Sequence, residues 1–184
     1  MMTGILLLSF LLTGCGSPEP QTGKKMSMYY INTAETKVEV HEQYLNTKTL
    51  DEQLDETMRY LSTTPEKLEY KAPLDMGFRV LDYEVEDGKL LINVDKAYSE
   101  LSPTTEVLVR AAIVRTLTQL PNVKYVGITV EDSQLYDNAG ELVGWMNTDQ
   151  FINNDGNEIN TYELVKVKLY FANADGDKLI AAYR

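Results

Sequence analysis

The sequence predicts an α+β domain in which a mixed or antiparallel sheet packs against two helices. Three observations lead to this fold class. Short segments of alternating apolar and polar residues, typical of strands, lie around two segments with helical periodicity. Asp87-Gly88 is a strong two-residue hairpin turn signal between two such segments. About 160 residues remain after the N-terminal signal and the linker described below, enough for one domain with a sizeable core.

The first 14 residues are typical of a secretory signal peptide. Ile5–Leu12 is an apolar run far shorter than the roughly 20 residues of a membrane-spanning helix. Leu12-Thr13-Gly14-Cys15 then resembles a lipobox, the motif at which a lipoprotein signal peptide is removed and the cysteine receives diacylglycerol. We therefore expect a lipoprotein signal peptide over 1–14 and a lipid anchor on Cys15. Met1-Met2-Thr3 departs from the pattern because it has no Lys or Arg, so we expect the natural start to lie upstream.

The composition narrows the chemistry of the domain. Cys15 is the only cysteine, so the domain behind it has no disulfide and no thiol nucleophile. The net charge is −11 and none of the charged residues lies in the signal peptide. A strongly acidic domain is not attracted to nucleic acid, to anionic lipid or to anionic wall polymer. We expect no nucleic acid partner, and the anchor must hold the protein at the membrane.

Residues 15–27 are expected to form a lipidated linker, followed by a strand pair. Met28–Ile31 and Lys37–His41 have strand-like composition and alternation. A helix follows, with Thr49 as N-cap and Glu52 completing a capping box. Its apolar residues recur at helical spacing at Leu50, Leu54, Met58 and Leu61, and it ends before Pro65.

The middle of the chain predicts a hairpin over 80–95, a longer helix and a central strand over 123–130. On the first hairpin strand, Leu81, Tyr83 and Val85 alternate with acidic residues. The helix begins with Ser102 as N-cap and Pro103 at its first position. Its inward face is expected to hold Val107, Ala111, Val114 and Leu117, widened by Leu108 and Ile113, with Arg110 and Arg115 pointing outward.

The rest of the chain is less regular. We expect a strand pair within 135–143 and a short helical turn over 146–152. A strand over 163–172 is expected to pair with one over 178–183. Residues 169–173 repeat the pattern of residues 28–32, so we expect 28–165 to be one domain and 166–184 the truncated start of a second copy.

Three segments resemble the GerMN domain of sporulation and spore-germination lipoproteins. They are Asp87–Val94, Ala111–Leu120 and Asn122–Val126, and Leu169–Gly176 resembles the opening strand of that domain. The resemblance covers residues 28–152 and again 167–184, and many members carry two such domains behind a lipobox. It implies a fold similar to the ring-building modules of envelope secretion complexes, no established catalytic residues, and a role in sporulation, germination or envelope assembly in Gram-positive bacteria.

The residues themselves offer no enzyme site. His41 is the only histidine and lies in an expected strand, where an exposed, structural position is favoured over a catalytic one. Asn153–Asn157 looks like part of a calcium loop, but the EF-hand positions would then fall on Phe151 and Tyr162, which cannot ligate calcium. We expect no metal, no cofactor and no catalytic residues.

Two groups of side chains leave a binding role open. Asp82, Glu84 and Glu86 are interpreted as the solvated face of a strand, since a glycosidase pair would need a partner across a cleft. Several tyrosines suit either strands or interfaces: Tyr29, Tyr30, Tyr83, Tyr98, Tyr125 and Tyr136. Trp145 is favoured as a core residue over a carbohydrate-stacking platform.

The sequence thus predicts a non-enzymatic, lipid-anchored interaction module outside the cytoplasm. Its expected partners are the membrane, through Cys15, and envelope or sporulation proteins, with binding residues unknown. The main alternative is a protein that binds or acts on peptidoglycan. A substrate-binding lipoprotein is disfavoured, because one domain of this length has little room for two lobes around a solute.

Overall fold

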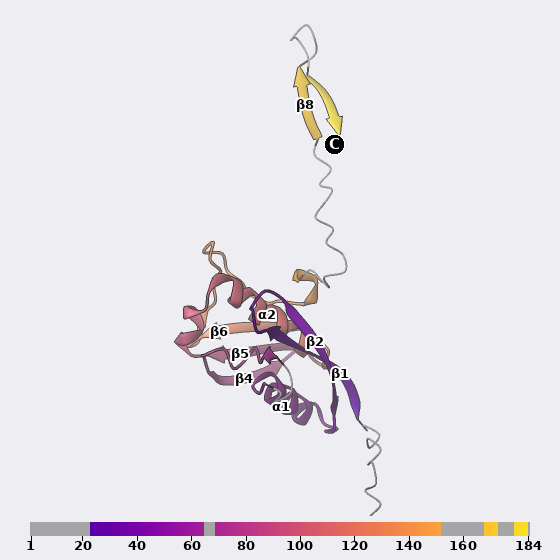
Figure 1. The fold of residues 1–184 in the computed structure, drawn as a ribbon, viewed down its shortest axis with the longest axis vertical. Coiled ribbons are helices and arrows are strands. Elements are labelled where there is room, and N and C mark those ends of the chain that lie inside the picture. Colours follow the sequence, from indigo (N-terminus) through magenta and orange to yellow (C-terminus); the bar gives the residue numbers. More distant parts are fainter. Residues whose placement is uncertain (1–22, 65–68, 152–167, 173–178, 184) are drawn as a thin grey trace, which may run out of the picture. The chain divides into compact units, whose positions relative to one another are not determined.

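A computed structural model of the chain describes residues 23–64, 69–151, 168–172 and 179–183 (Figure 1). The chain divides into two units, Met1–Phe151 and Ile152–Arg184, and each is described by itself. The expected signal peptide, the expected lipidation site Cys15 and the segment 153–157 lie outside the described residues. Within the described part, no helix combines the length and the apolar character needed to cross a membrane.

The first unit is an α+β domain, which confirms the predicted fold class. Its strands form an antiparallel sheet in the order β2-β1-β3 and a mixed sheet in the order β4-β5-β6-β7. The elements are β1 (Lys24–Asn32), β2 (Val38–Leu45), α1 (Leu50–Leu61), β3 (Tyr70–Lys71), β4 (Val80–Glu86), β5 (Lys89–Val94), the 3-10 helix η1 (Lys96–Glu100), α2 (Pro103–Leu117), β6 (Tyr125–Val130), β7 (Ser133–Gln134) and the 3-10 helix η2 (Thr148–Gln150).

Local sequence signals set several of these boundaries. Thr49 accepts a hydrogen bond from the Glu52 amide and the Glu52 carboxylate accepts from the Thr49 amide, so the predicted capping box forms at α1. Ser102 caps α2, with Pro103 at its first position. Asp87 and Gly88 have φ angles of 50° and 81°, the left-handed geometry that the tight β4–β5 turn requires.

A β-bulge alters the predicted alternation of β4. Val80 pairs with Val94 and Asp82 with Asn93, which leaves Leu81 as the extra residue. Leu81 was expected on the apolar face together with Tyr83, but its side chain is 49% exposed. The prediction for Leu81 is wrong because the bulge shifts the strand by one residue at this point.

Helix α2 is buried on more sides than predicted, because it packs against β1, β2 and β6 as well as α1. One core cluster joins residues of both sheets to α2. Val107, expected to point inward, is 45% exposed, whereas Val109 is fully buried. Arg110, expected to point outward, keeps only 13% of its side chain exposed and pairs with Glu106. The burial of Arg110 follows because α2 has more than one covered face, whereas the prediction assumed a single one.

Side chains at the C-terminal end of α2 and just after it hydrogen-bond the edge of β1 that β3 leaves unpaired. β3 pairs with β1 only at Ile31 and Asn32. The Tyr29 amide donates to Thr116 Oγ1 at 3.0 Å, and Gln119 bonds both the amide and the carbonyl of Ser27 at 3.0 and 2.7 Å. Thr116 of α2 and Gln119, just after the helix, therefore take the place of a neighbouring strand, which protects the edge and fixes the helix on the sheet.

The turn between β1 and β2 is tied to the same helix. Glu35, with a φ angle of 54°, accepts a hydrogen bond from Thr105 Oγ1 at 2.5 Å and pairs with Lys71 of β3. The hydrogen bond from Lys71, followed by the one from Thr105, holds the pKa of Glu35 below its usual value. One carboxylate thus joins the hairpin turn, the first turn of α2 and the short strand β3.

The second unit contains an antiparallel hairpin of β8 (Lys168–Ala172) and β9 (Leu179–Tyr183). Its register matches that of β1 and β2. Ala172 and Leu179, which pair, each lie 141 positions after Ile31 and Val38, which also pair (172 − 31 = 179 − 38 = 141). The same offset relates the other β8–β9 pairs to pairs of the first hairpin. The repeat seen in the sequence thus extends to strand pairing.

We expect Thr116→Val to lower the free energy of unfolding by about 1–3 kcal/mol, because the partly buried Tyr29 amide loses its acceptor while the side-chain shape is kept. Urea unfolding would measure the change. Thr118→Val is the matched control, since Thr118 also bonds a carbonyl one turn back but has no bond to β1. Equal effects of the two substitutions would show that the contact with β1 contributes nothing.

Candidate binding cleft

The structure does not build an enzyme site around the residues considered from the sequence. His41 lies in β2 opposite Met28 and is half-buried, less exposed than expected. Asp82, Glu84 and Glu86 are exposed along β4, as predicted for the solvated face of a strand. Within the described ranges, no group of three or more His, Cys, Asp or Glu side chains is placed to hold a metal ion.

The mixed sheet has one face in the core and one outer face. The core face carries apolar side chains that are at least nine-tenths buried: Leu90, Ile92, Val94, Val126 and Ile128. Residues of opposite parity form the outer face: Lys89, Leu91 and Asn93 on β5, and Tyr125, Gly127 and Thr129 on β6. The alternating strand geometry thus presents a mixed polar and apolar surface away from the core.

The outer edge of β6 is paired at both ends but not in the middle. β7 pairs with Thr129 and Val130, and Met146 forms a bridge with Val126. Between them, Gly127 and Ile128 have no strand partner on this edge. The intervening loop closes on itself instead, since the Val143 amide donates to the Leu135 carbonyl at 3.0 Å and Tyr136 bridges Leu142. The predicted strand pair over 135–143 is thus reduced to these contacts.

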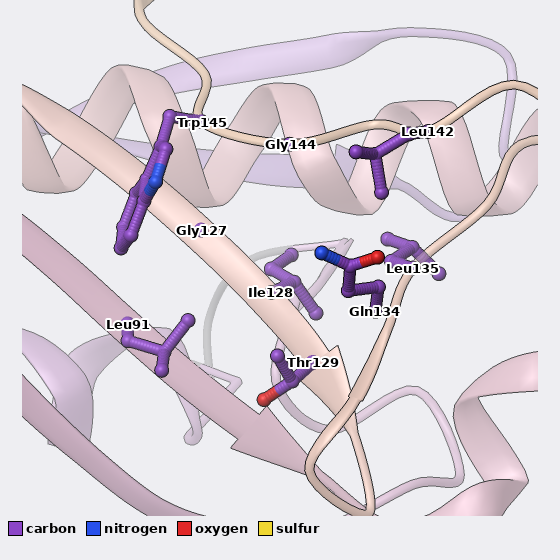
Figure 2. Close-up of a pocket in the computed structure, with 9 residues that line it drawn as sticks. All are labelled: Leu91, Gly127, Ile128, Thr129, Gln134, Leu135, Leu142, Gly144 and Trp145. Atoms are coloured by element: carbon purple, nitrogen blue, oxygen red, sulfur yellow. The ribbon is translucent and has the colours of Figure 1, made fainter.

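A cleft of about 200 Å³ opens where the loop leaves β6 (Figure 2). Trp145 forms one side, and Leu142 and Gln134 lie across from it. The lining is mostly apolar and consists of Leu91, Gly127, Ile128, Thr129, Gln134, Leu135, Leu142, Gly144 and Trp145. Ile128, whose side chain lies on the core face, is only 5% exposed as a whole residue and adds little open surface to the cleft.

Trp145 is not a core residue, contrary to the prediction, because the residue is 42% exposed. Its ring lies against the backbone of Gly127. A Cβ on Gly127 would come within 2.8 Å of Trp145 Cζ3, so only glycine permits this approach. The Lys89 ammonium lies 5.3 Å from the ring centroid, at cation–π distance. A glycine inside a strand marks such an approach, so Gly127 was the available signal in the sequence.

A buried polar network lies on the other side of the Trp145 segment. Arg110 Nε and Nη2 donate to the two carboxylate oxygens of Glu106 at 2.6 and 2.8 Å, and Tyr98 Oη donates to the same carboxylate at 3.0 Å. Arg110 Nη1 also approaches Met146 Sδ at 3.9 Å. Burial, followed by the Glu106 charge, raises the pKa of Tyr98 well above its usual value, so the hydroxyl remains a donor. The four-residue spacing of Glu106 and Arg110 was the signal for this pair.

A second network supports the end of the cleft at Thr129. Asn93, only 4% exposed, donates to Asp82 at 3.2 Å and to Asp132 at 2.7 Å. Its side-chain oxygen Oδ1 accepts from Thr129 Oγ1 and from the Asp132 amide. Glu131 and Asp132 have φ angles of 48° and 64°, so Asn93 stabilises a turn made of two left-handed non-glycine residues. Carboxylates are thereby held next to an apolar cleft.

We expect Gly127→Ala to push Trp145 away from β6 and to increase its contact with water. Trp145 is the only tryptophan, so its fluorescence reports this movement directly. The emission should shift to longer wavelength and acrylamide should quench it more strongly. Ser133→Ala, at an exposed site in β7, should leave both unchanged; an unchanged spectrum for Gly127→Ala would refute the proposed contact.

Comparisons with known proteins agree with this fold. A model of the Germane family, described as sporulation and spore germination, matches residues 27–136, more than half of the chain. The first GerMN domain of the sporulation protein GerM from Bacillus subtilis is similar with a TM-score of 0.53 and 14% identity, over 69% of this chain and 98% of that one. No match was found among curated proteins.

Two further solved structures are similar. The tandem GerMN domains of the same Bacillus subtilis protein match with 18% identity and a TM-score of 0.49, over 73% of this chain and 49% of that one. The present chain therefore spans about half the length of the tandem structure. A putative lipoprotein from Clostridium perfringens matches with 17% identity and a TM-score of 0.47, over 69% of this chain and 89% of that one. On the family match, this chain belongs to the Germane (GerMN) family and is related to sporulation and germination.

Proposed function

We propose that this protein is a membrane-anchored, non-enzymatic interaction module that acts outside the cytoplasm in a sporulation or germination complex. The family match to residues 27–136 is the observation that carries this proposal. The lipobox-like sequence before Cys15 supports the anchor. The cleft beside Trp145 supports binding.

Lipid on Cys15 gives the protein a means of staying at the membrane. The net charge of −11 opposes adsorption to anionic lipid or wall polymer. A diacylglycerol supplies two acyl chains, which suffice for stable anchoring where one chain does not. The anchor therefore confines the domain to the membrane surface and raises its local concentration for partners there.

Binding, rather than turnover, fits the composition of the cleft. General acid–base catalysis requires an ionisable side chain within hydrogen-bonding reach of the reacting group. The nine residues that line the cleft include no ionisable side chain. An exposed aromatic ring, an exposed leucine and an open strand edge are instead typical of recognition surfaces.

Residues 166–184 are part of this proposal as the opening of a second copy of the domain. The shared register of the two hairpins supports this division, with 28–165 as the first copy. Tandem GerMN domains occur in the Bacillus subtilis protein GerM. A second copy would offer a complex another surface of similar shape.

Peptidoglycan binding is the alternative function, and the exposure of Trp145 is the observation that favours it. A tryptophan ring can stack on a sugar, and Gln134 across the cleft offers polar atoms. Pull-down with purified wall freed of charged polymers would separate the two functions. Strong retention of the monomer would support the alternative and contradict a purely protein-binding role.

We expect Cys15→Ser to abolish lipidation and to release the protein from the membrane fraction, because the thioether can form only on cysteine. Metabolic labelling with a radioactive fatty acid and fractionation of sporulating cells would measure both effects. Ser17→Ala is a control two residues away that keeps the thiol. Membrane retention of Cys15→Ser at the level of the unmodified protein would contradict the anchor.

A further inference from the structure

We propose that the cleft binds a basic segment of a partner protein, inserting an apolar side chain between Trp145 and Leu142. Neighbouring Lys or Arg side chains of that segment would face carboxylates at the border of the cleft. This inference rests on the proposed function, because it specifies the partner chemistry of the interaction module. Its argument comes from the charge around the cleft, its apolar lining and the unpaired edge of β6.

Strand register places three carboxylates in a row beside the cleft. Across the β4–β5 pair, Asp82 faces Asn93, Glu84 faces Leu91 and Glu86 faces Lys89. Leu91 lines the cleft, so the row borders it along β4, an edge strand of the mixed sheet. All three are exposed, and none forms an ion pair with a Lys or Arg in the part of the chain that the structure describes.

The turn after β6 adds acidic residues at the Thr129 end. Asp132 is held there by Asn93 at 2.7 Å, and Glu131 precedes it in the turn. On the outer face formed by β4, β5 and β6, Lys89 is the single basic side chain, and Glu86 lies opposite it. The border is thus strongly negative, which favours a cationic partner and speeds its approach.

The cleft itself favours an apolar side chain rather than a charged one. Trp145 and Leu142 remain 42% and 52% exposed, although their neighbours supply an apolar floor. Filling the space between them would remove this apolar surface from water. An apolar centre with a charged border is the usual arrangement of a protein-binding surface.

The edge of β6 gives the partner backbone a place to bond. On this edge, Gly127 and Ile128 lie between the bridge to Met146 and the pairing with β7. Both residues line the cleft, so an extended segment inserted along this edge could exchange hydrogen bonds with the β6 backbone. This requirement favours a polypeptide over a sugar or a lipid headgroup.

Other possible ligands of the cleft match the negative charge of its border less well. A second copy of this chain also carries a net charge of −11, so its acidic surface would be repelled by the acidic border of the cleft. The neighbouring segments of the chain itself have no excess of positive charge: residues 15–22 contain no Lys or Arg, and residues 152–167 contain Asp155, Glu158 and Glu163 against the single Lys166. Nucleic acid, anionic lipid and anionic wall polymer are repelled for the same reason.

Three synthetic heptapeptides with the same apolar residues would test the proposal. Their sequences are Lys-Val-Lys-Phe-Lys-Val-Lys, the same with Glu for Lys, and the same with Ser for Lys. Binding to the full chain in neutral-lipid nanodiscs would be measured by calorimetry. We expect the basic peptide to bind at least about tenfold more tightly than the serine peptide, and the acidic peptide to bind least.

Variants locate the binding. Trp145→Ala and Leu142→Ala should each lower the affinity for the basic peptide by about tenfold, because each removes a central contact. Both residues are substantially exposed, and thermal unfolding would confirm that the variants fold. The double substitution Glu84→Gln and Glu86→Gln should lower the affinity for the basic peptide by about threefold at low salt. Glu69 is an exposed glutamate outside the mixed sheet, so Glu69→Gln should leave the affinity unchanged.

The proposal is overturned if the serine or acidic peptide binds as well as the basic one, if no peptide binds, or if folded Trp145→Ala and Leu142→Ala bind normally. Counting heat-resistant spores after complementation separates the two proposals. If neither Cys15→Ser nor Trp145→Ala restores heat-resistant spores, the result supports both the anchor and the cleft. If only Cys15→Ser fails to restore spores, the result supports the anchor and overturns the proposal for the cleft. If both variants restore spores, the proposed function itself is contradicted.

Discussion

The parallel pairing of β5 with β6 is the constraint on which the rest of the domain depends. Parallel neighbours need a long crossover, and α2 provides it. Once α2 covers the core face of the mixed sheet, its other sides must also be satisfied. They pack against β1 and β2, and Thr116 and Gln119 bond the open edge of β1. One helix therefore joins two sheets into a single core.

The same helix also supports the cleft, although it does not line it. Arg110 is buried with Glu106 and Tyr98, an arrangement that would be costly if any member were missing. Its guanidinium reaches Met146, whose backbone bridges Val126 on β6. Trp145 is thereby held beside Gly127, while the loop before it turns away from the strand. A chain of contacts from α2 through Met146 to β6 thus adjoins the exposed ring.

Local signals predicted much of the fold, because they act over a few residues. The capping box at Thr49, the Ser102 cap and the Asp87-Gly88 turn all depend on neighbours in sequence, and all three form as predicted. The errors arise from tertiary structure. Leu81 is displaced by a bulge, and Arg110 is buried because α2 has more than one covered face.

The candidate site was harder to predict, since its parts come from separate strands and a loop. Nothing in the local sequence of Trp145 indicates that its ring lies on Gly127, 18 positions earlier (145 − 127 = 18). The acidic alternation of β4 was recognised as a solvated face, but its position beside an apolar cleft follows only from strand order and register. Gly127 and the spacing of Glu106 and Arg110 were the usable signals.

Crosslinking from inside the cleft tests the central claim most directly. A photoreactive amino acid would replace Leu142 in the full chain, and the crosslinked fragments from sporulating cells would be sequenced by mass spectrometry. The account predicts a segment of another protein in which Lys or Arg residues flank an apolar side chain. Crosslinks to peptidoglycan, to a second copy or to other parts of this chain would contradict it.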